Sequence, residues 1–275
     1  MSGKVPAPSG ARREKTLVEV KPLITIAVIN QKGGVGKTTT CVNLAAELGA
    51  MRKKVLVVDA DPQGNASTGL GFQFDDSKSL YDVLSGGEEL KWALHSTSAK
   101  NVSLVASNIN LVGFDLEMSS AQGREFLLAH ALEQAQDDFD VTLIDCPPSL
   151  GLLTVNALAA ASRLIVPMQC EYYAMQGLSL LAHTVQMIRE RGINPAAQID
   201  AILLTMYNPN LRLTREIEAQ IREVFGTHVL KTVIPRNVDL AAAPAQGLAI
   251  RDYGRSSRGG EAYHDLALEV KRLWL

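Results

Sequence analysis

The sequence lacks most of the features that mark secreted, zinc-binding or membrane proteins. Its 275 residues include only three cysteines, and Cys41, Cys146 and Cys170 are not closely paired as in a zinc or iron–sulfur motif. We therefore expect reduced, buried thiols. No uninterrupted apolar run reaches the ~18 to 20 residues that span a bilayer, and the N-terminus lacks the apolar core of a signal peptide. These absences predict a cytoplasmic protein.

An excess of positive charge is also missing. The chain has 27 Lys and Arg against 29 Asp and Glu, a formal net charge of −2, so any nucleic-acid surface has to be a local patch. Residues 1–22 differ, because basic side chains outnumber Glu14 and Glu19 there. This segment has little to bury, which predicts a flexible basic tail. The tail is either a solvated extension or an arm that touches a partner or DNA.

Residues 30–40, N-Q-K-G-G-V-G-K-T-T-T, are the most informative stretch of the chain. They follow an apolar run at 24–29 and lead into apolar residues at helical spacing, so we expect a strand, a loop and a helix. A glycine-rich loop in that context turns its backbone N–H groups around a phosphate, and the helix presents its positive dipole end to the same anion. The sequence departs from the P-loop pattern G-x-x-x-x-G-K-[ST] at one position only. This match disfavours the alternative, a glycine-rich turn that binds no ligand.

The P-loop pattern gives roles to individual residues. Lys37 is expected to reach the β- and γ-phosphates, and the Thr38 hydroxyl is expected to ligate Mg²⁺. The residues predicted to contact the phosphates are Gly33, Gly34, Val35, Gly36, Lys37, Thr38 and Thr39.

The one departure from the pattern is informative. Gln31 stands at the first glycine position, and an additional lysine, Lys32, follows it. The segment K-G-G-V-G-K-T resembles the deviant Walker A motif of the ParA/MinD ATPases. In that family the additional lysine crosses a dimer interface and touches the nucleotide bound by the other subunit. The resemblance therefore implies a homodimer that forms on ATP, with Lys32 as a catalytic and nucleotide-contacting residue.

Carboxylates follow two further predicted strands. The run 55–58 ends in D-A-D-P-Q-G-N, and the run 141–145 ends in Asp145, before C-P-P. Ligands bind at the carboxyl ends of strands in open α/β sheets, and a carboxylate there can hold Mg²⁺ through water. Both segments match the family's patterns, which implies that Asp61 orients the attacking water and that Asp59 and Asp145 support the metal. The alternative for the first segment is an Asx-rich turn.

The last predicted strand, 229–234, ends in P-R-N. In the family this turn lies beside the adenine ring, which implies base contacts from the backbone at Pro235 and from the Asn237 amide. A guanine-reading N-K-x-D segment is absent from the sequence, which favours ATP.

The remaining pattern completes an α/β fold. We expect further strands at 102–106, 163–168 and 199–205, and helices at 79–84, 124–136, 178–188 and 261–275. A chain of this length that is 47% hydrophobic can bury a substantial core. The prediction is a doubly wound, mostly parallel sheet flanked by helices, the P-loop NTPase fold, with residues 23–275 as one ATPase domain.

The chain also departs from its relatives where DNA is bound. Chromosomal members of the family carry two arginines associated with sequence-independent DNA binding, and ungapped alignment places Asn210 and Asp239 at those positions. We predict that a helical ridge replaces them, opposite an apolar stripe of Leu213, Ile217, Ile221 and Val224. The ridge consists of Arg212, Arg215 and Arg222. The alternative is an ordinary solvated helix face with pairs such as Arg215 to Glu218.

The resemblance covers about residues 24–270 and points to partition ATPases of the ParA/Soj type. It implies that ATP and Mg²⁺ close two subunits face to face, and that water attacks the γ-phosphate with its charge stabilised by Lys37 and the partner subunit's Lys32. Hydrolysis would then open the dimer and release DNA. The implied partners are a ParB-type centromere-binding protein and non-specific double-stranded DNA, with no membrane and a nucleoid-associated location.

Two other interpretations remain open. A MinD-like membrane-associated positioning ATPase needs a C-terminal amphipathic helix with a basic face and a free apolar face, whereas only Lys271 and Arg272 supply positive charge near the end. A nitrogenase-reductase-like electron carrier shares the P-loop but needs cysteines that bridge a cluster between subunits.

Overall fold

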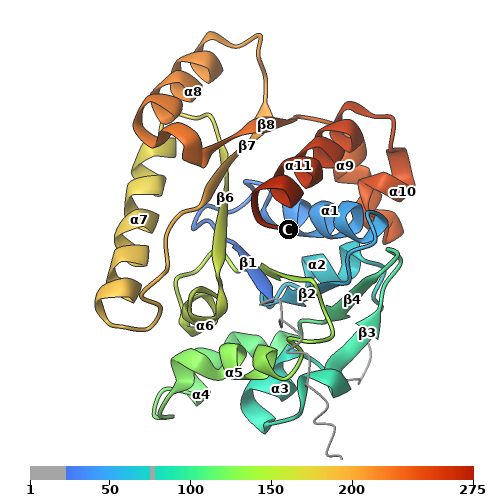
Figure 1. The fold of residues 1–275 in the computed structure, drawn as a ribbon, viewed down its shortest axis with the longest axis vertical. Helices are drawn as coiled ribbons and strands as arrows, with labels where there is room; N and C mark the ends of the chain where they lie inside the picture. Colours follow the sequence, from blue (N-terminus) through green and yellow to red (C-terminus); the bar gives the residue numbers. More distant parts are fainter. Residues whose placement is uncertain (1–22, 75–77) are drawn as a thin grey trace, which may run out of the picture.

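An eight-stranded sheet runs through the centre of the structure, with helices on both faces (Figure 1). This computed structural model describes residues 23–74 and 78–275, so the predicted basic tail at 1–22 lies outside the described residues. The strand order is β3-β4-β2-β5-β1-β6-β7-β8, and every neighbouring pair is parallel except β3 with β4. The strands are β1 (Ile24–Val28), β2 (Val55–Asp59), β3 (Leu94–Ser96), β4 (Val102–Val105), β5 (Val141–Asp145), β6 (Arg163–Gln169), β7 (Ala201–Tyr207) and β8 (Val229–Pro235).

The inner strands are buried on both faces. Every residue of β2 and β5 is buried, as expected of Val- and Ile-rich runs that helices cover from both sides. Strand β1 lies between β5 and β6. The strands on one side of β1 and those on the other side are added to the sheet in opposite directions, so the strand order reverses there. Ligands bind outside the carboxyl ends of strands at such a switch point. The predicted P-loop follows β1 directly and therefore lies at that position.

Two groups of helices cover the two faces, and each group has its own apolar cluster. One face carries α1 (Lys37–Ala50), α2 (Asn65–Gly69), α9 (Val238–Ala242), η5 (Ala243–Gln246), α10 (Ile250–Gly254) and α11 (Arg258–Trp274). The other face carries α3 (Leu80–Gly86), η1 (Leu90–Ala93), η2 (Ile109–Gly113), α4 (Phe114–Glu117), η3 (Arg124–Phe126), α5 (Leu127–Glu133), α6 (Leu152–Ala160), α7 (Ala174–Glu190) and α8 (Arg212–Phe225), with η4 (Gly226–His228) leading into β8. Figure 1 shows α1 and α11 packed together on the first face.

The predicted fold class is confirmed, and each predicted strand is present. Strand β7 begins at Ala201 rather than at residue 199. The helix expected at 124–136 is a 3₁₀ turn followed by the short α5. Strand β3 and helix α6 were not predicted. Helix α6, L-L-T-V-N-A-L-A-A, is apolar on nearly every side and so has little of the periodicity that marks a helix.

The apolar stripe predicted on α8 is partly wrong. Ile217 and Ile221 are buried together with Thr214, as the core-facing side of the helix requires. Leu213 and Val224 are 48% and 63% exposed. The buried side of α8 is therefore narrower than the predicted stripe and is rotated away from Leu213.

Helix α11 uses its apolar side to pack on the sheet. Tyr263, Leu266 and Val270 are buried, whereas Leu273 is 52% exposed. The buried Glu269 carboxylate accepts the backbone N–H groups of Lys231 and Thr232, each at 2.9 Å, on the edge strand β8. These bonds satisfy two donors that an edge strand would otherwise leave open.

Candidate active site

The loop between β1 and α1 has the backbone of a phosphate cradle. Gly34 and Gly36 have φ values of 71° and 90°, a region that glycine adopts without steric cost. Gly36 is the N-cap of α1, and no side chain caps that end. The first N–H groups of α1 are thus left to bind an anion, with the helix dipole acting in the same direction.

The ends of β6 and β7 hold this loop in place. Their side chains bond to carbonyl groups of the loop, so its N–H groups stay directed into the cleft. Two hydrogen bonds are of this kind: Gln169 Nε2 donates to Gly34 O at 2.8 Å, and Thr205 Oγ1 donates to Val35 O at 2.8 Å. The side chain of Asn30, at the start of the loop, adds two more, because its Nδ2 donates to Pro167 O of β6 at 2.8 Å and its Oδ1 accepts from Lys32 N at 2.9 Å. Sequence reasoning missed Gln169 and Thr205, although their positions at strand ends beside β1 could have indicated them.

Lys37 folds back over the loop. Its side chain is only 7% exposed, and Nζ donates to the backbone oxygen of Lys32 at 3.2 Å. Burial lowers the pKa of Lys37, and the charge of Asp145 opposes that change. A cation held in a partly dehydrated cleft interacts strongly with any phosphate that enters it.

The carboxylates of β2 and β5 lie side by side, because Asp59 and Asp145 are register partners in the parallel ladder. Asp59 accepts the N–H of Ser67 at 2.8 Å and its hydroxyl at 2.7 Å, and also accepts the N–H of Asp61 at 3.2 Å. Burial raises the pKa of Asp59 to about 6 in spite of these bonds. Asp59 is thus held as a buried acceptor that fixes the start of α2.

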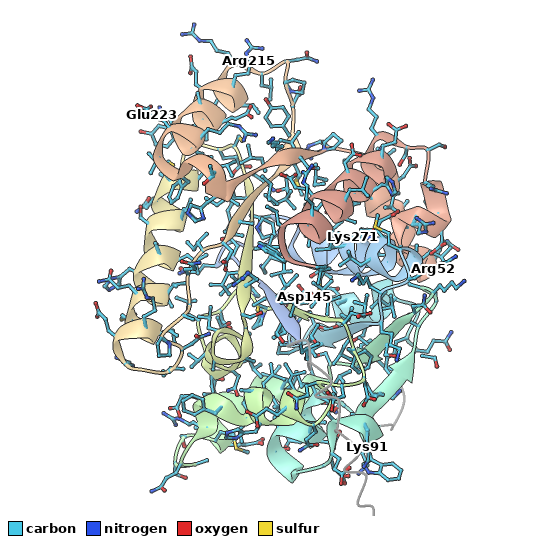
Figure 2. The ribbon with its side chains drawn as sticks, in the orientation of Figure 1. Arg52, Lys91, Asp145, Arg215, Glu223 and Lys271 are labelled. Carbon is cyan, nitrogen blue, oxygen red and sulfur yellow. The ribbon has the colours of Figure 1, made fainter. Side chains whose placement is uncertain are left out.

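Asp145 is the unusual carboxylate of the two. It is fully buried at the centre of the fold (Figure 2), and among the described residues neither of its oxygens has a hydrogen-bond partner. Burial raises its pKa well above the usual range, as does the neighbouring charge of Asp59, while the adjacent Thr38 hydroxyl, outside strict hydrogen-bond geometry, and the charge of Lys37 lower it. A buried carboxylate without a partner costs free energy. Oxygen ligands of this kind suit a hard cation or its water shell.

A cleft of about 450 Å³ opens beside these groups. The structure brings together there most of the residues predicted from the loop, and Asp61 also lines the cleft. The predicted site residues that line the cleft are Gly33, Gly34, Gly36, Lys37, Thr38, Thr39 and Asp61. Asp61 is held through its Oδ1, which accepts the N–H of Gln63 at 3.0 Å.

A narrower slot of about 180 Å³ adjoins the cleft at Gly36 and Thr39. Pro235 and Asn237 line it, as the prediction of base contacts requires. Asn237 also caps α9, because its Oδ1 accepts the N–H of Leu240 at 3.1 Å. This bond uses one of the two lone pairs of Oδ1, so the amide NH₂ and the other lone pair are left for a ligand. The sequence did not reveal this restriction.

Comparisons with known proteins agree with this site. A family model described as an AAA domain matches residues 23–199. The chromosome-partitioning ATPase Soj of Treponema pallidum is 44% identical over 90% of this chain and 96% of its own length. The chromosome partitioning protein ParA of Caulobacter vibrioides is 41% identical over 92% and 96%. This chain belongs to the ParA/Soj family of partition ATPases.

Solved structures related to the ParA/Soj chain share its fold. A Mycobacterium smegmatis protein named cobyrinic acid a,c-diamide synthase, crystallised with an ATP analogue and magnesium, is 37% identical with a TM-score of 0.81, over 92% of this chain and 95% of that one. MinD of Pyrococcus horikoshii, crystallised with Mg-ADP, is 28% identical with a TM-score of 0.75, over 91% and 97%. No helix in the described part of our chain is long and apolar enough to cross a bilayer.

The additional lysine of this ParA/Soj chain lies outside the phosphate cradle. Lys32 forms an ion pair with Glu171, just beyond β6, and the two side chains are 54% and 50% exposed. It is not among the residues that line the cleft. The exposed pair Tyr172 and Tyr173 follows Glu171 directly. The rim next to the P-loop thus presents charged and aromatic groups to solvent.

The three arginines predicted to form one ridge are in different surroundings. Arg212 pairs with Glu216 at 2.6 Å and is exposed, and Arg215 donates to the backbone oxygen of Pro209 at 2.7 Å. Figure 2 shows Arg215 at the outer end of α8, directed away from the sheet.

Arg222 is tied down by its neighbours. It pairs with Glu218 at 2.8 Å and donates to the backbone oxygen of Leu230 at 3.2 Å. Glu218 accepts bonds from Arg222 and Tyr207, so the expected pair of Arg215 with Glu218 is wrong. Arg222 therefore fastens α8 to β8.

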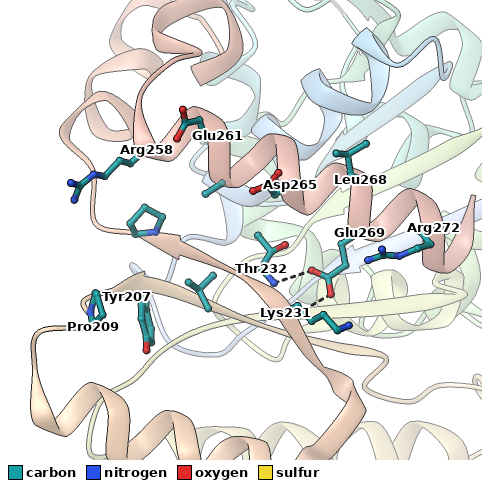
Figure 3. A pocket seen from close by; sticks show the side chains of 13 residues that line it. Tyr207, Pro209, Lys231, Thr232, Arg258, Glu261, Asp265, Leu268, Glu269 and Arg272 are labelled. Carbon is teal, nitrogen blue, oxygen red and sulfur yellow. Dashed lines mark hydrogen bonds between the residues drawn. The ribbon is translucent and has the colours of Figure 1, made fainter.

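A separate hollow lies between the edge strand β8 and α11 (Figure 3). Its volume is about 680 Å³, and both cations and carboxylates line its walls. Figure 3 shows Glu269 bound to the backbone of Lys231 and Thr232. The cations Lys231, Arg258 and Arg272 face the carboxylates Glu261, Asp265 and Glu269. This balance of charge does not make a phosphate site.

The cysteines are buried, as predicted, and free. Burial raises the pKa values of the Cys41 and Cys146 thiols. A protonated thiol in the core cannot reach across a subunit interface. The electron-carrier interpretation required surface cysteines that bridge a cluster, and these thiols do not supply them.

Proposed function

We propose that this chain is a Mg²⁺-dependent ATPase that partitions DNA. The observation that carries the ATPase proposal is the buried, unpartnered carboxylate of Asp145 beside Lys37, at the end of a braced glycine-rich loop. Related structures with bound ATP analogue or ADP and magnesium support the same assignment. Mg²⁺-dependent release of phosphate from ATP by the purified protein tests it. No phosphate release, with or without DNA, would contradict it.

The residues of the cleft divide the work of phosphoryl transfer. The backbone from Gly33 to Thr39 holds the β- and γ-phosphates, and Lys37 neutralises charge on them. Thr38 and Asp145 would hold Mg²⁺, which would supply charge neutralisation for phosphoryl transfer. Asp59 supports that site by fixing Ser67 and Asp61. Asp61, which also lines the cleft, orients the attacking water.

The slot beside the cleft is the site proposed for the base. The backbone at Pro235 and the amide of Asn237 are the groups proposed to read its edge. The apolar lining of the slot favours a flat aromatic ring. With no N-K-x-D segment in the chain, ATP is the proposed nucleotide.

Lys32 is proposed to act on a second subunit. Lys37, Thr38 and Asp61 line the cleft, whereas Lys32 stands outside on its rim. An exposed ion pair such as Lys32–Glu171 contributes at most ~1 kcal/mol. The lysine is therefore readily released to contact the nucleotide of a partner subunit. Two subunits would close face to face on ATP and separate after hydrolysis.

Replacing Lys32 by Ala is expected to remove the ATP-dependent dimer. Nucleotide affinity should stay within about threefold of the parent, because Lys32 is proposed to make no contact with the nucleotide in its own subunit. Size-exclusion chromatography with ATP and Mg²⁺ measures the dimer, and calorimetry measures the affinity. Glu171→Gln is the matched control, since it removes the same ion pair but keeps the lysine. Loss of the dimer in the control, or its persistence in Lys32→Ala, would contradict a role for Lys32 across the interface.

DNA binding and partition are the cellular part of the proposal. The partition proteins among the relatives support it. We propose that the ATP dimer binds double-stranded DNA without sequence preference and is stimulated by a ParB-type partner, which would give a nucleoid-associated protein. Arg212 and Arg215 are the proposed phosphate contacts on α8, because both are exposed and extend from its outer end. Arg222 is a weaker candidate because it is bound to Glu218 and Leu230.

Reversing Arg212 and Arg215 to Glu is expected to weaken DNA binding and to flatten the plot of log affinity against log salt by about 0.9 for each lost contact. Binding to a duplex of random sequence, measured by fluorescence anisotropy over a salt series with ATP present, gives both quantities. Arg189→Glu with Arg191→Glu, at the exposed end of α7, is the control of equal charge. Equal salt slopes in the parent and the α8 variant would show that this ridge is a solvated face.

The membrane-associated alternative has less support. It needs a free apolar face on the C-terminal helix, and Tyr263, Leu266 and Val270 of α11 are buried against the sheet. Co-sedimentation with anionic liposomes in the presence of ATP separates this alternative from the favoured proposal.

A further inference from the structure

Met206 is held in a backbone conformation that side chains rarely adopt. Its φ is 47°, in the left-handed region where a long side chain costs roughly 1 kcal/mol or more. The register of β7 with β8 shifts between Leu204 and Tyr207. Such a bulge re-aims one side chain next to an active site. The strain and the bulge together direct Met206 out of the regular alternation of β7.

The thioether lies between the phosphate loop and the turn after β8. Met206 Sδ accepts from Gln169 Nε2 at 3.0 Å and lies 3.7 Å from Arg236 Nη2. The same Gln169 Nε2 donates to Gly34 O of the P-loop at 2.8 Å. Met206 therefore contacts one side chain that braces the phosphate loop and another that belongs to the P-R-N turn.

Met206 also faces both hollows of the site. It lines the phosphate cleft of about 450 Å³ and the adjoining slot of about 180 Å³. The other walls of the slot are mainly apolar or glycine, including Gly36, Ile234 and Leu240. Met206, with its polarizable thioether, therefore lies where the phosphate cleft and the slot meet.

We propose that Met206 is the side chain against which the purine ring of the nucleotide packs, and that it positions the base relative to the phosphate loop. The inference rests on the proposed nucleotide site and adds to it a residue that determines the fit of the base. A thioether makes favourable contacts with the edge or face of an aromatic ring. The two hydrogen-bonding neighbours hold the sulfur in place, which makes this wall more rigid than a free methionine.

The strained backbone gives the proposal a second support. Glycine would satisfy φ near +47° without cost, yet the chain places a long side chain at this position. Strain of this kind persists where the surroundings enforce it, and it clusters at ligand sites. A side chain needed as a wall of the slot explains why the position is not glycine.

The test compares ATP with inorganic triphosphate, which has the phosphates but no base. Isothermal titration calorimetry with Mg²⁺ would be run on the parent, Met206→Leu, Met206→Ala and Met206→Gly, with the slowly hydrolysed analogue AMPPNP in place of ATP. Met206→Gly removes the side chain and relieves the backbone strain, and an unchanged triphosphate affinity shows that the variant is folded. Met187→Ala, on the outer part of α7 and away from both hollows, is the matched control.

We expect Met206→Ala and Met206→Gly to bind AMPPNP about tenfold or more weakly, and Met206→Leu about threefold more weakly. Triphosphate affinity should stay within twofold of the parent in all of them. An equal loss for both ligands would make Met206 only a brace of the phosphate loop and would overturn the proposal, as would an unchanged AMPPNP affinity. If the parent binds neither ligand, the proposed nucleotide site itself is wrong.

Discussion

Replacing Lys37 by Ala is expected to reduce ATP affinity by at least about a hundredfold, the largest effect that the structure predicts. Lys37 is the one cation among the side chains lining the described cleft, and it is nearly buried there. Charge-assisted hydrogen bonds contribute roughly 1.5 to 3 kcal/mol each, and about 2.7 kcal/mol corresponds to a hundredfold change in Kd. Titration calorimetry with ATP and Mg²⁺ measures the loss.

The fold should tolerate this change. Lys37→Met keeps most of the aliphatic stem and should lose ATP equally, which separates the charge from packing. Lys53→Ala, beyond the C-terminal end of α1, removes a lysine from the same region outside the cleft and should bind like the parent. Normal ATP affinity in both Lys37 variants would place the phosphate site elsewhere.

Replacing Asp61 by Ala is expected to leave ATP affinity within about threefold of the parent and to lower the rate of hydrolysis about a hundredfold or more. Asp61 faces the cleft from the end of β2 and has no role in the cradle of backbone N–H groups. It therefore acts on the water that reacts rather than on the bound phosphates, and its loss should appear in kcat with KM nearly unchanged. Phosphate release under single-turnover conditions measures the step.

Asp138→Ala, in the exposed turn after α5, is the control that removes a carboxylate far from the cleft. Its hydrolysis rate should equal that of the parent. A normal rate in Asp61→Ala would pass the role of orienting water to another group. A hundredfold loss of affinity would instead make Asp61 a ligand of the nucleotide complex.

The sequence predicted the glycine-rich loop and its place beside the cleft well, because the geometry of this loop is local. The loop from Gly33 to Lys37 lies between one strand and one helix, so the pattern of residues specifies both the turn and the position of the lysine. Asp59 and Asp145 were predicted because carboxylates at the ends of buried parallel strands necessarily meet at one edge of the sheet. Their register pairing follows from that rule and from the strand order.

The parts that could not be predicted depend on contacts between distant segments. Nothing in the sequence around Lys32 indicates its ion pair with Glu171, and nothing around Asn237 indicates how much of its amide is used in capping α9. On α8, the periodicity identified the helix but misplaced its buried side. Arg222 then became a link to β8 instead of part of a free ridge, since tertiary packing sets which part of a helix faces the sheet.

The bulge at Met206 shows the same limit most clearly. The run 199–205 reads as a buried strand, and methionine, which follows it at position 206, is not a residue type that signals a positive φ. The conformation arises from the irregular pairing of β7 with β8. Local sequence preferences do not predict a strained backbone of this kind. Because strained residues gather at ligand sites, a contact with the ligand explains this one better than its local sequence does.

The most direct test of the ATPase cycle is the association state of Asp61→Ala with each nucleotide. In this variant ATP should bind but remain intact, so the state before hydrolysis can be examined at equilibrium. Sedimentation velocity with ATP and Mg²⁺ should give a dimer of this 29.7 kDa chain, and the same protein with ADP and Mg²⁺ should give a monomer. The same association state with both nucleotides, whether monomer or dimer, would contradict an ATPase whose γ-phosphate controls the joining of two subunits.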